Sequence, residues 1–177
     1  MAAASTYLSE CARATAPGES RFRIRAAIAP ARAARVIALD ERAEGVANRL
    51  AGRGWRHARF YTNRSGRGPG PVGSGPGGSG PGGELLLREL DGPFVRLEEV
   101  LTDTDVVVVL ATEDGGRAAA SAIGRLCGRK GITTAGVVLG DGFEAGDAVA
   151  ALRPYARVLL LSADESDVFE LLTALRV

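Results

Sequence analysis

Residues 103–140 read DTDVVVVLATEDGGRAAASAIGRLCGRKGITTAGVVLG and carry the clearest structural signal in the chain. The run 106–110 is apolar at every position, which is typical of a strand inside a parallel sheet that helices cover on both faces. A helical pattern follows, and its apolar face consists of Ala119, Ile123, Leu126 and Cys127. Gly128 and Gly131 are expected to end this helix, and 132–139 predicts the next strand. The segment therefore predicts a strand–helix–strand unit.

The same alternation continues on both sides of this unit. Upstream, a strand at 36–39, a helix that ends at Gly52 and Gly54, and a strand at 58–62 predict a βαβ unit. The other expected elements are a strand at 84–90, a helical stripe of Phe94, Leu97, Val100 and Leu101, a helix at 145–152, a strand at 157–161 and a helix at 164–175 capped by Ser162 or Asp164. We expect an α/β fold of three-layer Rossmann-like type, with a mostly parallel sheet and helices on both faces.

Two segments stand apart from this pattern. Residues 64–83 are dominated by Gly, Pro and Ser, a composition that cannot build a core, so we expect a disordered linker there. Residues 1–20 are expected to form a flexible N-terminal arm, and 21–177 a single Rossmann-like domain interrupted by the linker. Two questions stay open: whether residues 1–34 pack on the domain, and whether the linker divides one sheet or two weakly coupled halves.

Charge is balanced over the 177 residues, whose formal net charge is +1, but it is unevenly distributed. Residues 1–67 carry 13 Arg and 5 acidic residues, whereas 68–177 carry 9 basic and 16 acidic residues. This asymmetry has two interpretations: an anionic partner for the first part, or attraction between the two parts of one folded unit, which we favour. The stretch 21–25 interleaves Arg with Phe22, yet a solvated strand face is the better interpretation, so no nucleic-acid partner is expected.

Compartment and source follow from composition. The longest apolar run is far too short to span a bilayer, and no apolar segment typical of a secretory signal follows Glu10, so we expect a cytoplasmic protein without membrane contact. Lys130 is the only lysine among 22 basic residues, which with the abundant Ala and Gly is typical of a high-GC bacterial genome. Cys11 and Cys127 lack metal-binding spacing, and His57 is the only histidine, so no metal site is expected.

Three segments together carry a family resemblance. Within 35–66, Asn48-Arg49 lies in the expected helix and Thr62-Asn63 ends the second strand. Residues 103–140 contain a strand, a Gly-containing loop, a helix and a T-x-G-V-V strand, and 143–146 read FEAG. In order and pattern these segments resemble the N-terminal nucleotide-binding domain of the tubulin/FtsZ family. The resemblance implies a nucleotide-binding α/β fold.

The phosphate-binding loops depart from that family. The glycine run after its first strand is replaced here by DERAEG at 40–45, and its G-G-G-T-G-T-G loop by TEDGGRA at 112–118. Carboxylates at these places repel an anion. The Gly/Pro linker replaces a further nucleotide-contacting loop, and no segment corresponds to the second domain that supplies acidic residues for hydrolysis. We therefore carry over no catalytic residue and no cofactor, and expect neither GTP hydrolysis nor filament formation.

The remaining site candidates follow the first and the most apolar strand, at the edge where open α/β sheets bind ligands. The weak ligand-binding candidates are Asp40, Glu113, Asp114, Gly115 and Gly116. A helix start with free N–H groups binds anions. For Asp40, however, we favour a helix-capping role. For residues 113–116 we favour a plain turn followed by a helix start. Asp141-Gly142 is interpreted as a turn. Acid/base catalysis by Asp40 and Asp114 would require the two side chains to meet at this edge.

Two function classes remain, and a third is less favoured. The first is a non-catalytic domain, FtsZ-like or generically Rossmann-like, that acts in regulation or through contact with an unidentified protein partner. The second is a small-ligand or nucleotide-binding domain that uses the carboxyl edge of the sheet. An enzyme of unknown reaction is the third, because the sequence contains no nucleophile motif and no G-x-G-x-x-G outside the Gly/Pro stretch at 64–83.

Overall fold

The computed structural model describes residues 30–63, 85–140 and 145–177. The chain divides into two compact units, Met1–Pro30 and Ala31–Val177, and only Pro30 of the first unit is among the described residues. The expected N-terminal arm, the linker at 64–83, the Asp141-Gly142 turn and Cys11 lie outside the described residues.

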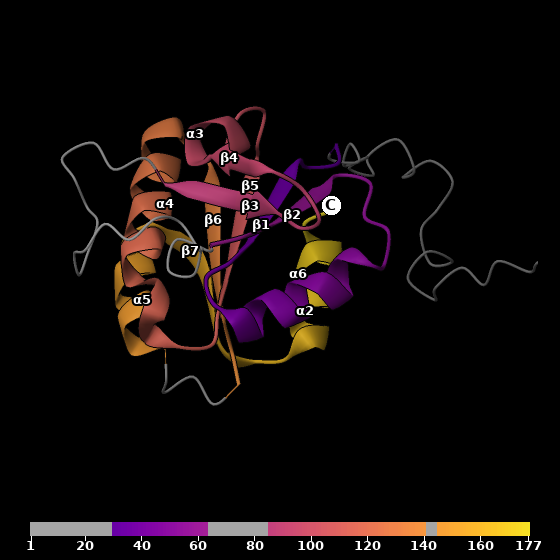
Figure 1. Ribbon diagram of the computed structural model, residues 1–177. Coiled ribbons are helices and arrows are strands. Elements are labelled where there is room, and N and C mark those ends of the chain that lie inside the picture. The colour runs from indigo at the N-terminus through magenta and orange to yellow at the C-terminus, as the bar shows by residue number, and fades with distance from the viewer. Residues whose placement is uncertain (1–29, 64–84, 141–144) are drawn as a thin grey trace, which may run out of the picture. The chain divides into compact units, whose positions relative to one another are not determined.

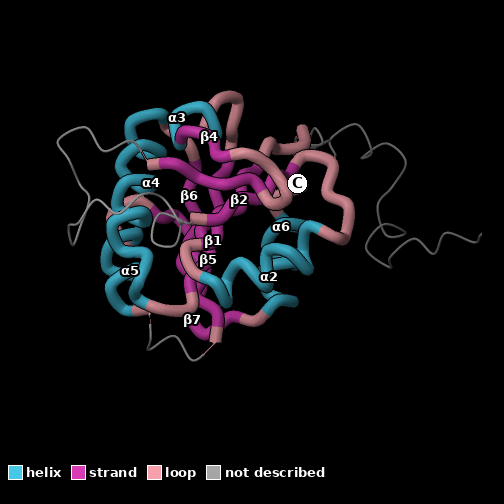
Figure 2. The backbone as a smooth tube through the Cα atoms, in the orientation of Figure 1, coloured by secondary structure: helices cyan, strands magenta, loops and turns pink. Residues whose placement is uncertain are grey.

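A single mostly parallel sheet organises this unit (Figures 1 and 2). Its strands are β1 (Ala34–Ala38), β2 (Ala58–Thr62), β3 (Leu86–Glu89), β4 (Phe94–Arg96), β5 (Val106–Ala111), β6 (Thr133–Leu139) and β7 (Ala156–Ala163). Their order across the sheet is β4-β3-β2-β1-β5-β6-β7. The strands from β2 to β7 in this order are parallel, while β3 runs antiparallel to β2 and β4 antiparallel to β3. The predicted α/β class with a mostly parallel sheet is confirmed.

The sheet also answers whether the linker separates two halves. β1 precedes residues 64–84 and pairs along its whole length with β5, which follows them. β2, before these residues, likewise pairs with β3, after them. The strands before and after residues 64–84 therefore belong to one sheet.

Helices connect the strands where the sequence predicts them. They are α2 (Glu41–Ala51), α3 (Leu97–Val100), α4 (Arg117–Lys130), α5 (Gly146–Leu152) and α6 (Glu165–Ala174), and a 3-10 turn, η2 (Asp114–Gly116), precedes α4. Asp40 caps α2, and Asp164 forms a capping box with Asp167 at α6. Gly131 ends α4 with a φ of 71°, a left-handed conformation that glycine adopts without strain.

β5 lies between β1 and β6, and all six of its residues are buried. Successive side chains of a strand point to opposite faces of the sheet, and β5 accordingly contributes to two hydrophobic clusters. Val107 and Val109 belong to a cluster that includes residues of α4 and α5, whereas Val106 and Val108 belong to one that includes residues of α2 and α6. Figure 1 shows α4 beside α5, and α2 beside α6. The prediction that this apolar run is an inner parallel strand is confirmed.

Three expectations about local structure are wrong. Phe94 does not belong to a helical stripe: it begins β4 and its side chain is 58% exposed. The reason is a tight turn, in which Asp91 has a φ of 62° and the N–H of Gly92 donates to the carbonyl of Glu89, so that β3 and β4 form a hairpin. Gly128 lies within α4 and does not end it. Ser162 belongs to β7, so Asp164 alone caps α6.

No helix in the three described ranges is long and apolar enough to cross a membrane.

Candidate functional site

The loops after β1 and β5 meet at the carboxyl edge of the sheet. β1 and β5 are neighbours, and the chain continues from β1 toward β2 on one side and from β5 toward β6 on the other. Ligands of open α/β sheets bind at such a reversal of strand order. All five candidate residues predicted from the sequence lie in these two loops, with Asp40 after β1 and residues 113–116 after β5.

The carboxylate of Asp40 joins the two loops. Its Oδ1 accepts hydrogen bonds from the backbone N–H of Ala43 (2.8 Å) and from the hydroxyl of Thr112 (2.6 Å). Its Oδ2 accepts from the backbone N–H groups of Thr112 (2.6 Å) and Glu113 (3.3 Å). Both oxygens are thus engaged by the start of α2 and by the loop after β5. The helix-capping role predicted for Asp40 is present, together with a contact to the second loop that the sequence did not reveal.

Asp114 makes a single contact with the start of α5. Its Oδ1 accepts a hydrogen bond from the backbone N–H of Asp147, in the first turn of α5 (2.6 Å). Arg117, at the start of α4, forms an ion pair with Asp147 (3.3 Å between Nη1 and Oδ1). The carboxylates of Asp40 and Asp114 therefore bind different backbone groups.

Gly116 is required for packing at this edge. A Cβ added to it would lie 2.6 Å from the Cβ of Leu39, the buried residue that follows β1. Contacts this short do not occur, so the loop approaches β1 closely only because residue 116 has no side chain. Gly116→Asp would consequently disturb the fold, so a loss of ligand binding in that variant would not identify a ligand site.

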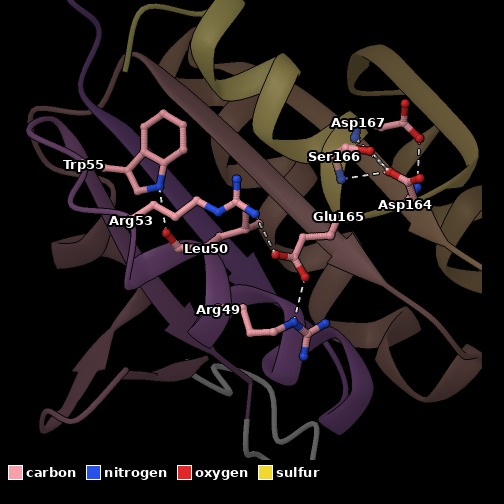
Figure 3. Close-up of polar contacts among 8 residues, drawn as sticks. All are labelled: Arg49, Leu50, Arg53, Trp55, Asp164, Glu165, Ser166 and Asp167. Carbon is pink, nitrogen blue, oxygen red and sulfur yellow. Dashed lines mark hydrogen bonds and ion pairs between the residues drawn. The ribbon is translucent and has the colours of Figure 1, made fainter.

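A second polar cluster joins α2 to α6 (Figure 3). Glu165 accepts from Nε of Arg49 (2.6 Å) and from Nη2 of Arg53 (3.2 Å). These hydrogen bonds, that of Arg49 above all, hold the pKa of Glu165 below its ordinary value. Arg53 also stacks over Phe169, 4.8 Å from the ring centroid, and Phe169 packs against Trp55. This cluster pairs basic residues before the linker with an acidic residue after it, as expected for attraction between the two parts.

Among the described residues, the other chemistry-bearing side chains form no metal-binding group. His57 is exposed, and the described ranges contain no group of three or more His, Cys, Asp or Glu side chains that could hold a metal ion. Cys127 is fully buried, as the sequence predicted, and burial raises the pKa of its thiol. A buried thiol with a raised pKa is a packing residue, because only the thiolate is a good nucleophile.

Sequence reasoning missed two residues of the carboxyl edge. Thr112 donates both its N–H and its hydroxyl to Asp40, and the N–H of Asp147 binds Asp114. Thr112 and Asp40 are 72 positions apart, and Asp147 and Asp114 are 33 positions apart. No local pattern links such pairs. A threonine directly after a buried strand was the one available signal, since the parallel register of β1 and β5, continued by two residues, places Thr112 opposite Asp40.

No protein-family model matches the sequence, and no curated protein is detectably similar to it.

Proposed function

We propose that this chain is a non-catalytic α/β domain that acts in regulation or through contact with a protein partner, without a bound nucleotide. The engagement of Asp40 carries the proposal. A phosphate at a helix start binds to free backbone N–H groups, and here the N–H groups of Ala43, Thr112 and Glu113 already donate to the Asp40 carboxylate. Asp40 occupies the role that an anionic ligand would have.

We further propose a three-layer Rossmann-like architecture related to the nucleotide-binding domain of the tubulin/FtsZ family. The strand order supports it: without the edge strand β4, the sheet reads β3-β2-β1-β5-β6-β7, which is the order of two βαβαβ halves around a central reversal. The antiparallel β3 is a departure from that pattern. The two hydrophobic clusters that share β5 also support helices on both faces of the sheet.

The second candidate is a nucleotide or other small anion bound at the same edge. One observation favours it: no side chain caps the start of α4, as is also the case for α3 and α5, whereas Asp40 caps α2 and Asp164 caps α6. The first N–H groups of α4 thus have no side-chain acceptor of the capping kind. Glu113 and Asp114 precede this helix start and oppose the approach of an anion.

Thermal unfolding of the full chain separates the two candidates. GTP, GDP, ATP, NAD and NADP are added singly at millimolar concentration, and the expected result is an unchanged melting temperature with each. A ligand present at a hundredfold excess over its Kd stabilises the native state by about 2.7 kcal/mol. A shift of several degrees with one nucleotide would overturn the proposal and establish the second candidate.

The Asp40→Ala variant tests the physical premise. Removing the carboxylate leaves three backbone N–H groups and the Thr112 hydroxyl without their acceptor, so stability is expected to fall by about 1–3 kcal/mol. Phosphate or acetate is expected to restore part of the melting temperature by binding the vacated groups. Asp164→Ala is the matched control, because Asp164 caps α6 through Ser166 and Asp167 within its own helix. Equal salt responses in both variants would contradict an internal anion at Asp40.

A further inference from the structure

β7 has the sequence of an inner strand but lies at the edge of the sheet. It spans eight residues, ARVLLLSA, and its centre is four consecutive apolar residues, 158–161. β5 and β6, which are of similar character, each have a strand on both sides, whereas β7 pairs with β6 alone among the described strands. A long apolar edge without Lys or Pro is a template for pairing with another strand.

Exposed apolar side chains lie on the same strand. Val158 is 40% exposed and Leu161 is 52% exposed. The only other large apolar side chains that are similarly exposed in the described ranges are Leu86 and Phe94, on the β3–β4 hairpin at the opposite edge. β4 at that edge is only three residues long. β7 is therefore the longer and more apolar of the two edges.

The charges at the two ends of β7 are opposite. Exposed Arg157 lies near its start, and exposed Asp164 follows its end. Hydrogen bonds from the Ser166 side chain, above all, and from the backbone lower the pKa of Asp164, which keeps its carboxylate charged. An antiparallel copy of the same strand would bring each arginine toward the other copy's aspartate, so the edge is complementary to itself.

We propose that β7 pairs antiparallel with β7 of a second copy of this chain, around a two-fold axis perpendicular to the sheet. Such an axis keeps the two faces of the sheet aligned, so paired residues must share a face. A register centred on Leu160 meets this condition and places Leu159 opposite Leu161 of the second copy. Arg157 then lies opposite Ala163 of the second copy, the residue before Asp164. This surface is separate from the carboxyl edge, and the inference does not depend on the proposed function.

The regular part of the edge is short, which limits the strength of the contact. The register between β6 and β7 shifts on either side of 158–160, and such irregularities locally disrupt the ladder of hydrogen bonds. We accordingly expect a dimer that dissociates on dilution.

Sedimentation velocity of the full chain, from about 5 to about 500 µM, tests the inference. The wild type is expected to shift from monomer to dimer within this range. Leu161→Lys is expected to raise the dissociation constant at least about tenfold, because lysine on an edge strand opposes pairing. Phe94→Lys, an equally exposed apolar position on the other edge, is the matched control and is expected to leave the dimer intact.

A charge reversal tests the antiparallel arrangement. Arg157→Glu places like charges together at both ends of the paired strands and is expected to weaken the dimer. Arg125→Glu, at an exposed position of α4, is its control. Melting temperatures confirm that each variant is folded. A wild type that stays monomeric throughout overturns the inference, as does a dimer disrupted by Phe94→Lys instead of Leu161→Lys. Equal effects of the two arginine variants overturn the antiparallel arrangement.

Discussion

Two glycines inside helices differ in what surrounds the place of their missing side chain. A Cβ added to Gly45 of α2 would lie 3.6 Å from Nη1 of Arg49, an ordinary contact, whereas one added to Gly124 of α4 would overlap the ring of Tyr155. Gly45→Ala is expected to raise the free energy of unfolding by about 0.5–1 kcal/mol, because alanine loses less backbone entropy in a helix. Gly124→Ala is expected to lower it by about 1–3 kcal/mol through overpacking. Chemical denaturation measures both.

The pair is its own control, since both substitutions add the same methyl group and the same helix propensity. A stabilising Gly124→Ala would show that Tyr155 moves aside at little cost. Sequence reasoning had placed Gly128, four residues later, at the helix end, and Gly124 had no assigned role. The reason for a glycine at 124 is a ring contributed by Tyr155, which follows α5.

At the scale of elements, the contact between α2 and α6 is expected to depend on pH. Glu165 bonds to Arg49 and Arg53, and its pKa lies below the ordinary value of glutamate. A lowered folded-state pKa stabilises the fold above the ordinary pKa of about 4.3, and this stabilisation is lost as pH falls through the lowered value. The difference in unfolding free energy between wild type and Glu165→Gln should therefore be largest near neutral pH and vanish in acid.

Glu170→Gln, an exposed position on the same helix, controls for the loss of a carboxylate as such. The effect is expected to be small and to weaken with salt, because Arg49 and Arg53 are largely exposed. A difference that persists unchanged at low pH would assign the role of Glu165 to something other than these ion pairs.

At the scale of the whole molecule, the sheet depends on strands from both sides of residues 64–84. β1 is completely buried between β2 and β5, apart from Arg35. A fragment of residues 85–177 keeps β5, β6 and β7 but exposes the side of β5 that β1 covers. We expect it to lack a cooperative thermal transition by circular dichroism, and to regain one when mixed with residues 1–63. A fragment that melts like the full chain would show two independent halves.

Much of the fold follows from local pattern. The apolar run of β5 predicted a buried inner strand, and the order aspartate-then-helix predicted the cap of α2, because side-chain periodicity and capping are both set by neighbours in the chain. Phe94 was misplaced because leucines and valines at 97–101 continue a helical spacing from it. Asp91-Gly92-Pro93 is a turn signal, but the same residues also suit a helix start, and the structure shows the turn, which makes the hairpin.

The sequence on its own was sufficient for the strands other than β4, most helices and the five candidate residues at the carboxyl edge, since each depends on residues close in the chain. Which groups the candidate residues contact at that edge is decided only by the tertiary structure. Asp40 meets Thr112 across 72 positions, and Arg49 meets Glu165 across 116. Parallel pairing of β1 with β5 brings the first pair together, and the packing of α2 against α6 the second. Contacts at such separations arise from strand order and packing, which no local periodicity encodes.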